Sequence, residues 1–361
     1  LNRQWSAAYD TSLARGLLKM RQREWLQDRA DCGTDVSCLK ESYQKRIGQL
    51  ASLTGFAPLS KYFSAGQIDP PMAEGLVSEG GYQLRDKHWL IQPLTSRYLL
   101  SRLNERKMEE IEGYQVVGHA VAGDNLYIYL AVYMQQGDNA LVEVDGLGNT
   151  RIPQTYSPDY TLYADPDGHN AVGKMHFFIH RSGQSPVRVS ADVVANGAEP
   201  ETLAEMPVAD GPLPGFEREA WQGFCSDVPC HSYSQSPSKK WRIASANFMS
   251  TDERDGVYLF DANRPDSGVN VFSQKANDRI ESVFSYMRNF VWGEGETFYF
   301  DNEGGMACVW RTDISTKSTE RIIPVESIKY PYYLKYRGRE MVVAIDTSEK
   351  GGVYIATPDV K

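Results

Sequence analysis

Two histidines stand at a spacing that could hold a metal ion. His176 and His180 flank three apolar residues, and because four is an even step along a strand, both side chains would point to the same side. The spacing is similar to the His-Glu-x-x-His pair that binds zinc, but the glutamate is absent and the local pattern is that of a strand. We therefore expect ordinary half-exposed histidines and no metal. The remaining histidines are scattered along the sequence: His88, His119, His169 and His231.

Oxygen-rich segments offer a second kind of chemistry. Residues 165–170 read Asp-Pro-Asp-Gly-His-Asn, which has the ligand types of half a calcium loop but lacks the distal glutamate of an EF-hand. Asp-Pro-Asp-Gly is first of all a turn signal, and the same holds for Asp252, Glu253, Arg254, Asp255 and Gly256. The sequence therefore predicts turns at both places and no cofactor.

The common catalytic motifs are absent from the sequence. It contains no Gly-x-Ser-x-Gly elbow, no Gly-x4-Gly-Lys-Ser/Thr phosphate loop and no Gly-x-Gly-x-x-Gly fingerprint. Cys308 stands alone within an apolar run and is expected to be a small buried residue, because a nucleophilic role would need a histidine beside it. On this basis the sequence predicts a protein that is not an enzyme.

The other four cysteines form two close pairs. Cys32 and Cys38 are six positions apart, and Cys225 and Cys230 are five apart. A structural zinc site usually needs Cys-x2–4-Cys spacing and a second pair nearby, so two short-loop disulfides in an oxidising compartment fit better. The chain begins at Leu1 without a methionine, and we expect an exported, periplasmic protein whose signal segment has been removed.

Size and charge narrow the class of protein. With 361 residues, the prior is two domains, perhaps three. The formal net charge is −9, which disfavours a nucleic-acid binder, and no apolar stretch reaches the roughly 18 residues of a membrane span. Residues 1–51 carry nine bases and six acids, for +3, so the rest of the chain carries −12. This asymmetry could steer a charged partner, although an exposed helix with ion pairs explains it as well.

Residues 1–52 are expected to form a helical hairpin. Apolar side chains recur every three to four positions through the first thirty residues, from Leu1 to Met20, which predicts one amphipathic helix. Gly33 breaks the pattern, and Asp35 can cap a second helix that continues to Leu50. A Cys32–Cys38 disulfide would join the two helices, which bury little core by themselves.

The hairpin residues also carry a resemblance. The run from Gln22 to Leu26, followed by Arg29, the two cysteines, Leu39, Tyr43 and Arg46-Ile47, resembles the N-terminal domain of the LprI lysozyme-inhibitor family. The likeness covers about 50 of the 361 residues. It implies a bacterial, exported protein that inhibits a hydrolase in some cases. The matched residues have structural roles and do not locate an inhibitory surface.

Beyond about residue 80 the period becomes that of strands. Runs such as 126–133 and 257–260 are β-branched and aromatic and end in Gly, Asp or Asn turns. Turn residues after successive runs recur at intervals of roughly 40–70 residues, which is typical of a β-propeller of about five to six blades. A β-sandwich pair is the alternative. Segment 98–103 is assigned to a strand by the repeat, although it would also suit an amphipathic helix.

One turn supports the propeller directly. Residues 236–241, Ser-Pro-Ser-Lys-Lys-Trp, resemble the Ser-Pro-Asp-Gly-Lys-Trp turn of TolB-type and WD40-like blades, with departures at Ser238 and Lys239. The predicted organisation is therefore a hairpin at 1–52, a linker at 53–80 and a propeller at 81–361. An acidic, proline-rich insertion at 197–230 is expected to be clipped at its base by Cys225–Cys230.

These features predict a protein-binding function. We expect a periplasmic inhibitor, and specifically an immunity protein that blocks the active-site cleft of a secreted toxin or hydrolase, such as a type VI lipase or phospholipase or a lysozyme-like enzyme. The candidate partner-binding residues are acidic loop positions: Asp252, Glu253, Asp255, Glu201 and Glu205. The alternative is a propeller enzyme or ligand-binding sensor of the bacterial envelope, which would bring histidines and carboxylates together at one mouth of the central tunnel. A loosely binding envelope scaffold is a third option.

Overall fold

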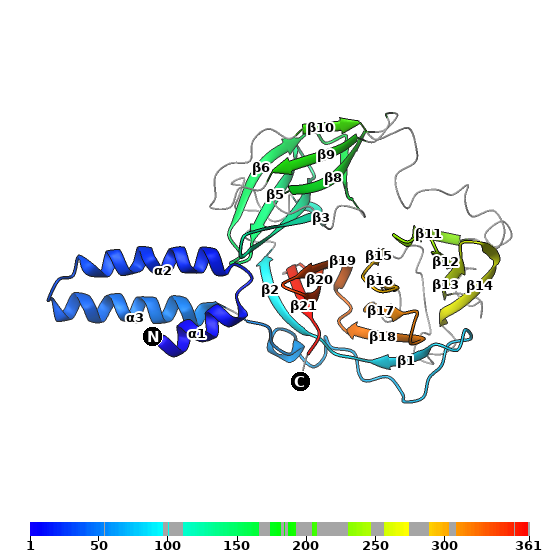
Figure 1. Cartoon of the computed structure of the whole chain (residues 1–361), viewed down its shortest axis with the longest axis horizontal. Coiled ribbons are helices and arrows are strands. Elements are labelled where there is room, and N and C mark those ends of the chain that lie inside the picture. The colour runs from blue at the N-terminus through cyan, green and yellow to red at the C-terminus, as the bar shows by residue number, and fades with distance from the viewer. Residues whose placement is uncertain are drawn as a thin grey trace.

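The computed structural model arranges the chain as a five-bladed β-propeller with a helical hairpin on one side (Figure 1). It describes residues 1–53, 55–96, 100, 111–165, 174–181, 184, 187–192, 204–207, 230–246, 256–273, 289–302, 308–349 and 351–359. Within these residues the strands form five separate sheets, each one blade. The prediction of a mainly β protein with N-terminal helices and a propeller body is confirmed.

Three blades are built from consecutive antiparallel strands. The first blade contains β3 (Ile111–Ala122), β4 (Asn125–Met134), β5 (Asn139–Asp145) and β6 (Thr150–Tyr156). The second contains β7 (Tyr160–Ala164), β8 (Lys174–Arg181), β9 (Val187–Asp192) and β10 (Ala204–Pro207). The third contains β11 (Cys230–Gln235), β12 (Trp241–Ala246), β13 (Gly256–Asp261) and β14 (Arg264–Ser273).

The last two blades recruit strands from the N-terminal half. The fourth blade contains β15 (Phe290–Trp292), β16 (Thr297–Asp301), β17 (Val309–Asp313) and β18 (Ser318–Ile323), and β1 (Gln83–Asp86) pairs in parallel with β18. The fifth contains β19 (Ile328–Tyr336), β20 (Arg339–Asp346), β21 (Gly352–Thr357) and β2 (Leu90–Ser96). Because β2 pairs with β21, the two ends of the body are joined within one sheet, which closes the ring.

The apolar strand runs follow from burial on both faces. In β4, Leu126, Ile128 and Leu130 pack with residues of the fifth blade, whereas Tyr127 and Tyr129 pack with those of the second. Since neither face meets water, the strand shows no alternation of polar and apolar residues. The same sandwiching occurs between the third and fourth blades and between the fourth and fifth, and it accounts for the continuous hydrophobic runs in the sequence.

The innermost strand of each blade comes first in its unit: β3, β7, β11, β15 and β19. Contacts join β19 to β3, β3 to β7, β11 to β15 and β15 to β19, so these strands surround the centre of the ring. Side chains carried by different innermost strands can therefore meet, although they lie far apart in the sequence.

Two helices of the hairpin lie side by side and project away from the propeller (Figure 1): α2 (Arg15–Ala30) and α3 (Val36–Ser52). A disulfide joins Cys32 to Cys38, and the Asp35 carboxylate caps α3 by accepting hydrogen bonds from the Ser37 and Cys38 amides. Both features agree with the sequence analysis.

The expectation of one helix over residues 1–30 is wrong, because the chain breaks between α1 (Asn2–Thr11) and α2. Leu13 is 1% exposed in the core of the first and fifth blades, and its carbonyl accepts a hydrogen bond from the Leu126 amide. Ala14 forms a β-bridge with Asn125. Because Leu13 and Ala14 bond to β4, they cannot be helical, and the helix is interrupted between α1 and α2.

The segment between hairpin and propeller runs along the outside of the last two blades. It contains the short 3-10 helix η1 (Leu59–Lys61) and forms bridges from Ala57 to Ile91 and from Ile68 to Val325. No helix in the described part of the chain is long and apolar enough to cross a membrane. The domain boundaries at 52 and 80 stay predictions. Most of segment 98–103 and most of the insertion at 197–230 lie outside the described residues.

Candidate functional site

Three neighbouring innermost strands bring polar side chains together near the centre of the propeller. His119 is on β3, Tyr332 is on β19, and Asp165 follows the last residue of β7. The His119 Nδ1 atom lies 2.9 Å from the Tyr332 hydroxyl, and the two rings meet edge to face with centroids 5.8 Å apart. His119 and Tyr332 are each 6% exposed and Asp165 is 3% exposed. The sequence separation of 213 residues between His119 and Tyr332 is bridged by adjacent blades.

Tyr332 stays protonated beside His119 because of its environment. Burial, and then the negative charge of Asp165, raise the pKa of the Tyr332 phenol above its ordinary value. The phenol therefore keeps its proton at neutral pH and can donate it to His119 Nδ1. An imidazole exchanges protons readily near pH 7, so this pair has the composition of an acid–base unit.

A neighbouring arginine fixes the carboxylate of the cluster. The Arg188 Nε on β9 donates to Asp165 Oδ2 at 2.6 Å, and Arg188 Nη2 lies 2.5 Å from the same oxygen. Both contacts reach the same carboxylate oxygen, so they fix its position with charge-assisted hydrogen bonds. Four blade strands thus hold an imidazole, a phenol, a carboxylate and a guanidinium in one place; we call this set the central cluster.

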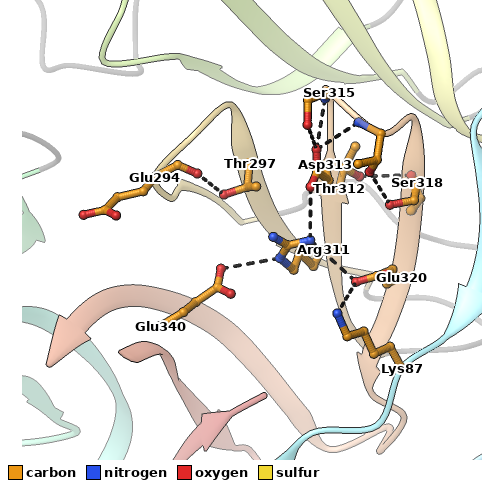
Figure 2. Close-up of polar contacts among 12 residues, drawn as sticks. Lys87, Glu294, Thr297, Arg311, Thr312, Asp313, Ser315, Ser318, Glu320 and Glu340 are labelled. Atoms are coloured by element: carbon orange, nitrogen blue, oxygen red, sulfur yellow. Dashed lines mark hydrogen bonds and ion pairs between the residues drawn. The ribbon is translucent and has the colours of Figure 1, made fainter. Parts of the chain in front are cut away.

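A second polar group lies between the fourth and fifth blades (Figure 2). Arg311 on β17 is flanked by three carboxylates, at 3.8 Å from Asp313, 3.5 Å from Glu320 and 3.4 Å from Glu340. Glu320 is 1% exposed, and it also contacts Arg85 at 2.5 Å and Lys87 at 3.7 Å. We call this group the inter-blade cluster.

Glu340 is the titratable member of the inter-blade cluster. Burial raises the pKa of its carboxyl to about 6, with a further increase from the charge of Glu294 and an opposing effect of Lys87. Its carboxylate nevertheless accepts from Arg311 Nε at 3.4 Å. Because this contact is long, the attraction of Arg311 for the Glu340 carboxylate is weaker than the effect of burial on its pKa. Glu340 can therefore change its charge near neutral pH.

Cys308 is buried and free, as the sequence analysis predicted. Its thiol donates to Asp69 Oδ2 at 3.0 Å. Burial, followed by the charge of Asp69, raises the pKa of this thiol well above its ordinary value. A thiol held in this form is a poor nucleophile.

The two predicted cysteine pairs have different outcomes. Cys32 and Cys38 are bonded. Cys225 lies outside the described residues, and Cys230 opens β11 without a described side chain. The Cys225–Cys230 disulfide therefore stays a prediction.

The predicted partner-binding residues are not placed by the structure. Asp252, Glu253, Asp255 and Glu201 lie outside the described residues. The backbone of Glu205 belongs to β10 and pairs with Val189, but its side chain is not described. These assignments stay untested.

His176 and His180 both lie on β8, paired with Ser190 and Thr161. Among the residues described, no group of three or more His, Cys, Asp or Glu side chains could hold a metal ion. The turn predicted at 165–170 is described only at Asp165, which pairs with Arg188.

Sequence reasoning missed Tyr332, Arg188, Arg311 and Glu340 as members of polar clusters. Each stands in a strand whose sequence resembles any other propeller strand, and its partners come from other strands or blades. The one available signal was a histidine in the long apolar run of β3, since a buried imidazole requires a hydrogen-bond partner.

No family model matches this chain, and no curated protein matches it. The resemblance of residues 1–50 to the LprI family is therefore not supported by a family match. Among solved structures, the chain is similar to RS223-β-xylosidase, with a TM-score of 0.36 and 10% identity over 67% of this chain and 91% of that chain. It is similar to the catalytic domain of the Coprinopsis cinerea GH62 α-L-arabinofuranosidase, with a TM-score of 0.36 and 8% identity over 76% and 98%. A third similar structure is TolB from Acinetobacter baumannii, with a TM-score of 0.24 and 11% identity over 68% of this chain and 54% of that chain.

These comparisons correct the predicted function. A non-enzymatic inhibitor or immunity protein is wrong as the main interpretation, because the structures similar to this chain include propeller glycoside hydrolases, and nothing supports a toxin or hydrolase as its partner. At 8–12% identity and TM-scores of 0.24–0.37, these likenesses transfer no substrate and no catalytic residue.

Proposed function

We propose that the chain is a propeller enzyme of the bacterial envelope that performs acid–base chemistry on a polar substrate at the central cluster. The observation that carries this proposal is the convergence of His119, Tyr332 and Asp165 from three innermost strands. A propeller uses its centre as a common meeting point for all blades, and this is where the alternative interpretation of the sequence required histidine and carboxylate to meet.

In this proposal His119 exchanges a proton with the substrate at Nε2, and the Tyr332 hydroxyl, hydrogen-bonded to Nδ1, orients the imidazole ring and fixes its tautomer. Tyr332 keeps its hydrogen because its pKa is raised by burial and by Asp165. Asp165 is held in place by Arg188 and stabilises positive charge that develops on the imidazole. General acid–base catalysis by such a pair contributes about 10²–10⁴-fold to a rate.

The test is turnover by purified protein and its variants. The structures similar to this chain include a β-xylosidase, an α-L-arabinofuranosidase and a sialidase from Trypanosoma rangeli. Their names suggest the first three probes: a nitrophenyl β-xyloside, a nitrophenyl α-arabinofuranoside and a methylumbelliferyl sialoside. We expect hydrolysis of at least one, with kcat lowered about 100-fold by His119→Asn and by Tyr332→Phe. His88→Asn is the matched control, because His88 is exposed between β1 and β2.

Two results would contradict the proposal. One is the absence of turnover of all three probes by well-folded protein. The other is turnover that His119→Asn and Tyr332→Phe leave unchanged. Binding of a probe without turnover would assign the chain to the ligand-binding sensors instead.

We also infer that the hairpin is of the LprI type and that the protein functions in the periplasm. The residues that carry the resemblance contact one another: Trp25 meets Tyr43 edge to face at 5.2 Å, Arg29 donates to the Tyr43 hydroxyl at 2.8 Å, and Arg46 donates to Gln22 Oε1. The Cys32–Cys38 disulfide supports an oxidising compartment. Fractionation of the native bacterium tests this inference: the protein should be recovered from the periplasm with both thiols blocked to alkylation, and recovery in the cytoplasm would contradict it.

A further inference from the structure

A pocket lies where the helical hairpin meets the propeller, away from both polar clusters. Its walls come from the ends of α1 and α3, from β2, and from the turn between β5 and β6. Its enclosed volume is about 70 Å³ and its mouth is open to solvent, so it can enclose one edge of a small molecule while the rest stays outside. Because two walls belong to the hairpin and two to the propeller, anything bound there touches both.

The chemistry of the walls defines the class of ligand. No charged side chain lines the pocket in the described part of the chain. Three hydroxyls, from Thr11, Ser12 and Ser52, alternate with apolar groups such as Leu53 and Leu147. Burying a charge without a partner is expensive, so the walls select a neutral molecule. Mixed hydroxyl and aliphatic surfaces match a molecule that carries hydroxyls around a hydrocarbon ring.

The hydroxyls present both hydrogen-bonding roles. Thr11 Oγ1 donates to the Ala7 carbonyl at 2.9 Å, and Ser52 Oγ donates to the Gln49 carbonyl at 2.8 Å, so their lone pairs are left to accept. Ser12 Oγ already accepts from the Ala14 amide at 3.0 Å, which leaves its hydrogen to donate. A hydroxylated ligand both donates and accepts, and this arrangement suits it.

Gln92, a lining residue on β2, has an unmet hydrogen-bonding requirement. Its side chain is 7% exposed, and its Oε1 atom is buried with no hydrogen-bond partner among the described residues. A buried carbonyl without a donor is destabilising, so a donor is missing at this place. A ligand hydroxyl, or a water held beneath the ligand, would supply it.

Two glycines fix the shape of the pocket. A Cβ atom at Gly146 would lie 2.5 Å from the backbone of Leu13, and one at Gly148 would lie 2.6 Å from the Leu94 carbonyl oxygen. The turn between β5 and β6 can therefore pack against the end of the hairpin and against β2 only because both positions lack side chains. The close packing makes this wall rigid and the pocket preformed.

From these contacts we infer that the junction pocket binds the hydroxylated edge of a neutral, polyhydroxylated ligand such as a sugar ring, and that the bound ligand braces the hairpin against the propeller. This site is independent of the central cluster, so it stands whether or not the chain is an enzyme. It also gives the hairpin a role in ligand binding that its distance from the centre of the ring would not suggest.

Binding is measured by saturation-transfer NMR and calorimetry with glucose, galactose and N-acetylglucosamine, each added alone. Binding of at least one sugar by the wild type is expected. Ser52→Leu places a bulky apolar group at the exposed rim and should weaken binding at least about tenfold, or 1.4 kcal/mol. Ser37→Leu is the matched control, because Ser37 is equally exposed at the other end of the same helix. Amide exchange at the ends of α1 and α3 should slow when the sugar is bound.

Gln92→Leu separates ligand binding from folding. It removes an acceptor that has no partner within the described residues, so the thermal midpoint should stay equal or rise while sugar binding is lost. The inference is overturned if none of the three sugars binds to the wild type, or if Ser52→Leu binds a sugar as tightly as Ser37→Leu does.

Discussion

Two arginines on adjacent strands of the fourth blade are held in opposite ways. Arg321 on β18 is fully buried, with its Nε 2.6 Å from Asp86, its Nη2 2.6 Å from the Pro70 carbonyl and its Nη1 3.6 Å from Asp69. Arg311 on β17 is partly open, and its ion pairs with three carboxylates lie between 3.4 and 3.8 Å. Short contacts in a dry environment are strong and fixed, whereas long contacts near water are weak and adjustable.

The two arginines therefore have different roles: Arg321 stabilises the fold, whereas Arg311 contacts a group that can respond to pH. Arg321 ties β1 and the segment before it to β18, because Asp69 and Pro70 lie before β1 and Asp86 is the last residue of β1. Arg311 instead joins two blades through Glu340, whose pKa lies near 6. The first arrangement holds chain segments together, and the second contains a group, Glu340, whose raised pKa lets its charge change near pH 6.

The largest effect is expected from Arg321→Met. Removing the guanidinium leaves Asp86 and Asp69 facing a buried methionine, and breaking a buried ion pair from one side costs about 3–5 kcal/mol. The free energy of unfolding, measured by urea titration, should fall by that amount. A loss below about 1 kcal/mol, the value of a surface pair, would contradict the assignment of Arg321 as a structural fastener.

Arg311→Met should have a smaller effect on the same blade. Glu320 keeps Arg85 and Lys87 as partners, so no buried carboxylate is left alone. We expect a loss of about 1 kcal/mol in the same urea titration, in the range of partly exposed ion pairs. A loss as large as that of Arg321→Met would mean that the inter-blade cluster is structural too, and it would remove the contrast between the two arginines.

Glu340 makes stability depend on pH, and the sign follows from its raised pKa. Below about pH 4.5 the carboxyl is protonated in both folded and unfolded chains; between pH 4.5 and 6 the unfolded chain ionises while the folded chain keeps its proton. Stability contributed by this group is therefore lost as pH rises through that window, by about 1 kcal/mol once its partial exposure is taken into account.

Glu340→Gln measures this contribution directly. The variant retains an acceptor for Arg311 but cannot ionise, so its stability relative to the wild type should increase by about 1 kcal/mol between pH 4.5 and 7. Urea titrations of both proteins at four pH values provide the comparison. Parallel pH profiles would show that Glu340 titrates normally and that the adjustable cluster does not respond to pH.

The contrast between local and distant partners also explains what the sequence could predict. Asp35, Cys32 and Cys38 act on residues within six positions, so the helix cap and the disulfide could be inferred from spacing. The strand runs could be inferred because each is buried on both faces. The polar clusters could not, since His119 meets Tyr332 across 213 residues and Arg311 meets Glu340 across 29, and both pairs form only after the ring closes. The break between α1 and α2 has the same origin, because its cause is the contact of Leu13 with β4.

The smallest effect is expected at an exposed pair that links neighbouring blades. Lys240 Nζ lies 3.0 Å from Glu296, but their side chains are 54% and 37% exposed. This contact is shorter than those of Arg311, yet water screens it on most sides, and its contribution should be below about 0.5 kcal/mol. Lys240→Ala should therefore shift the urea midpoint within error at 0.15 M salt. A loss equal to that of Arg311→Met would mean that contact length, and not exposure, separates the adjustable ion pairs of this propeller from the fixed ones.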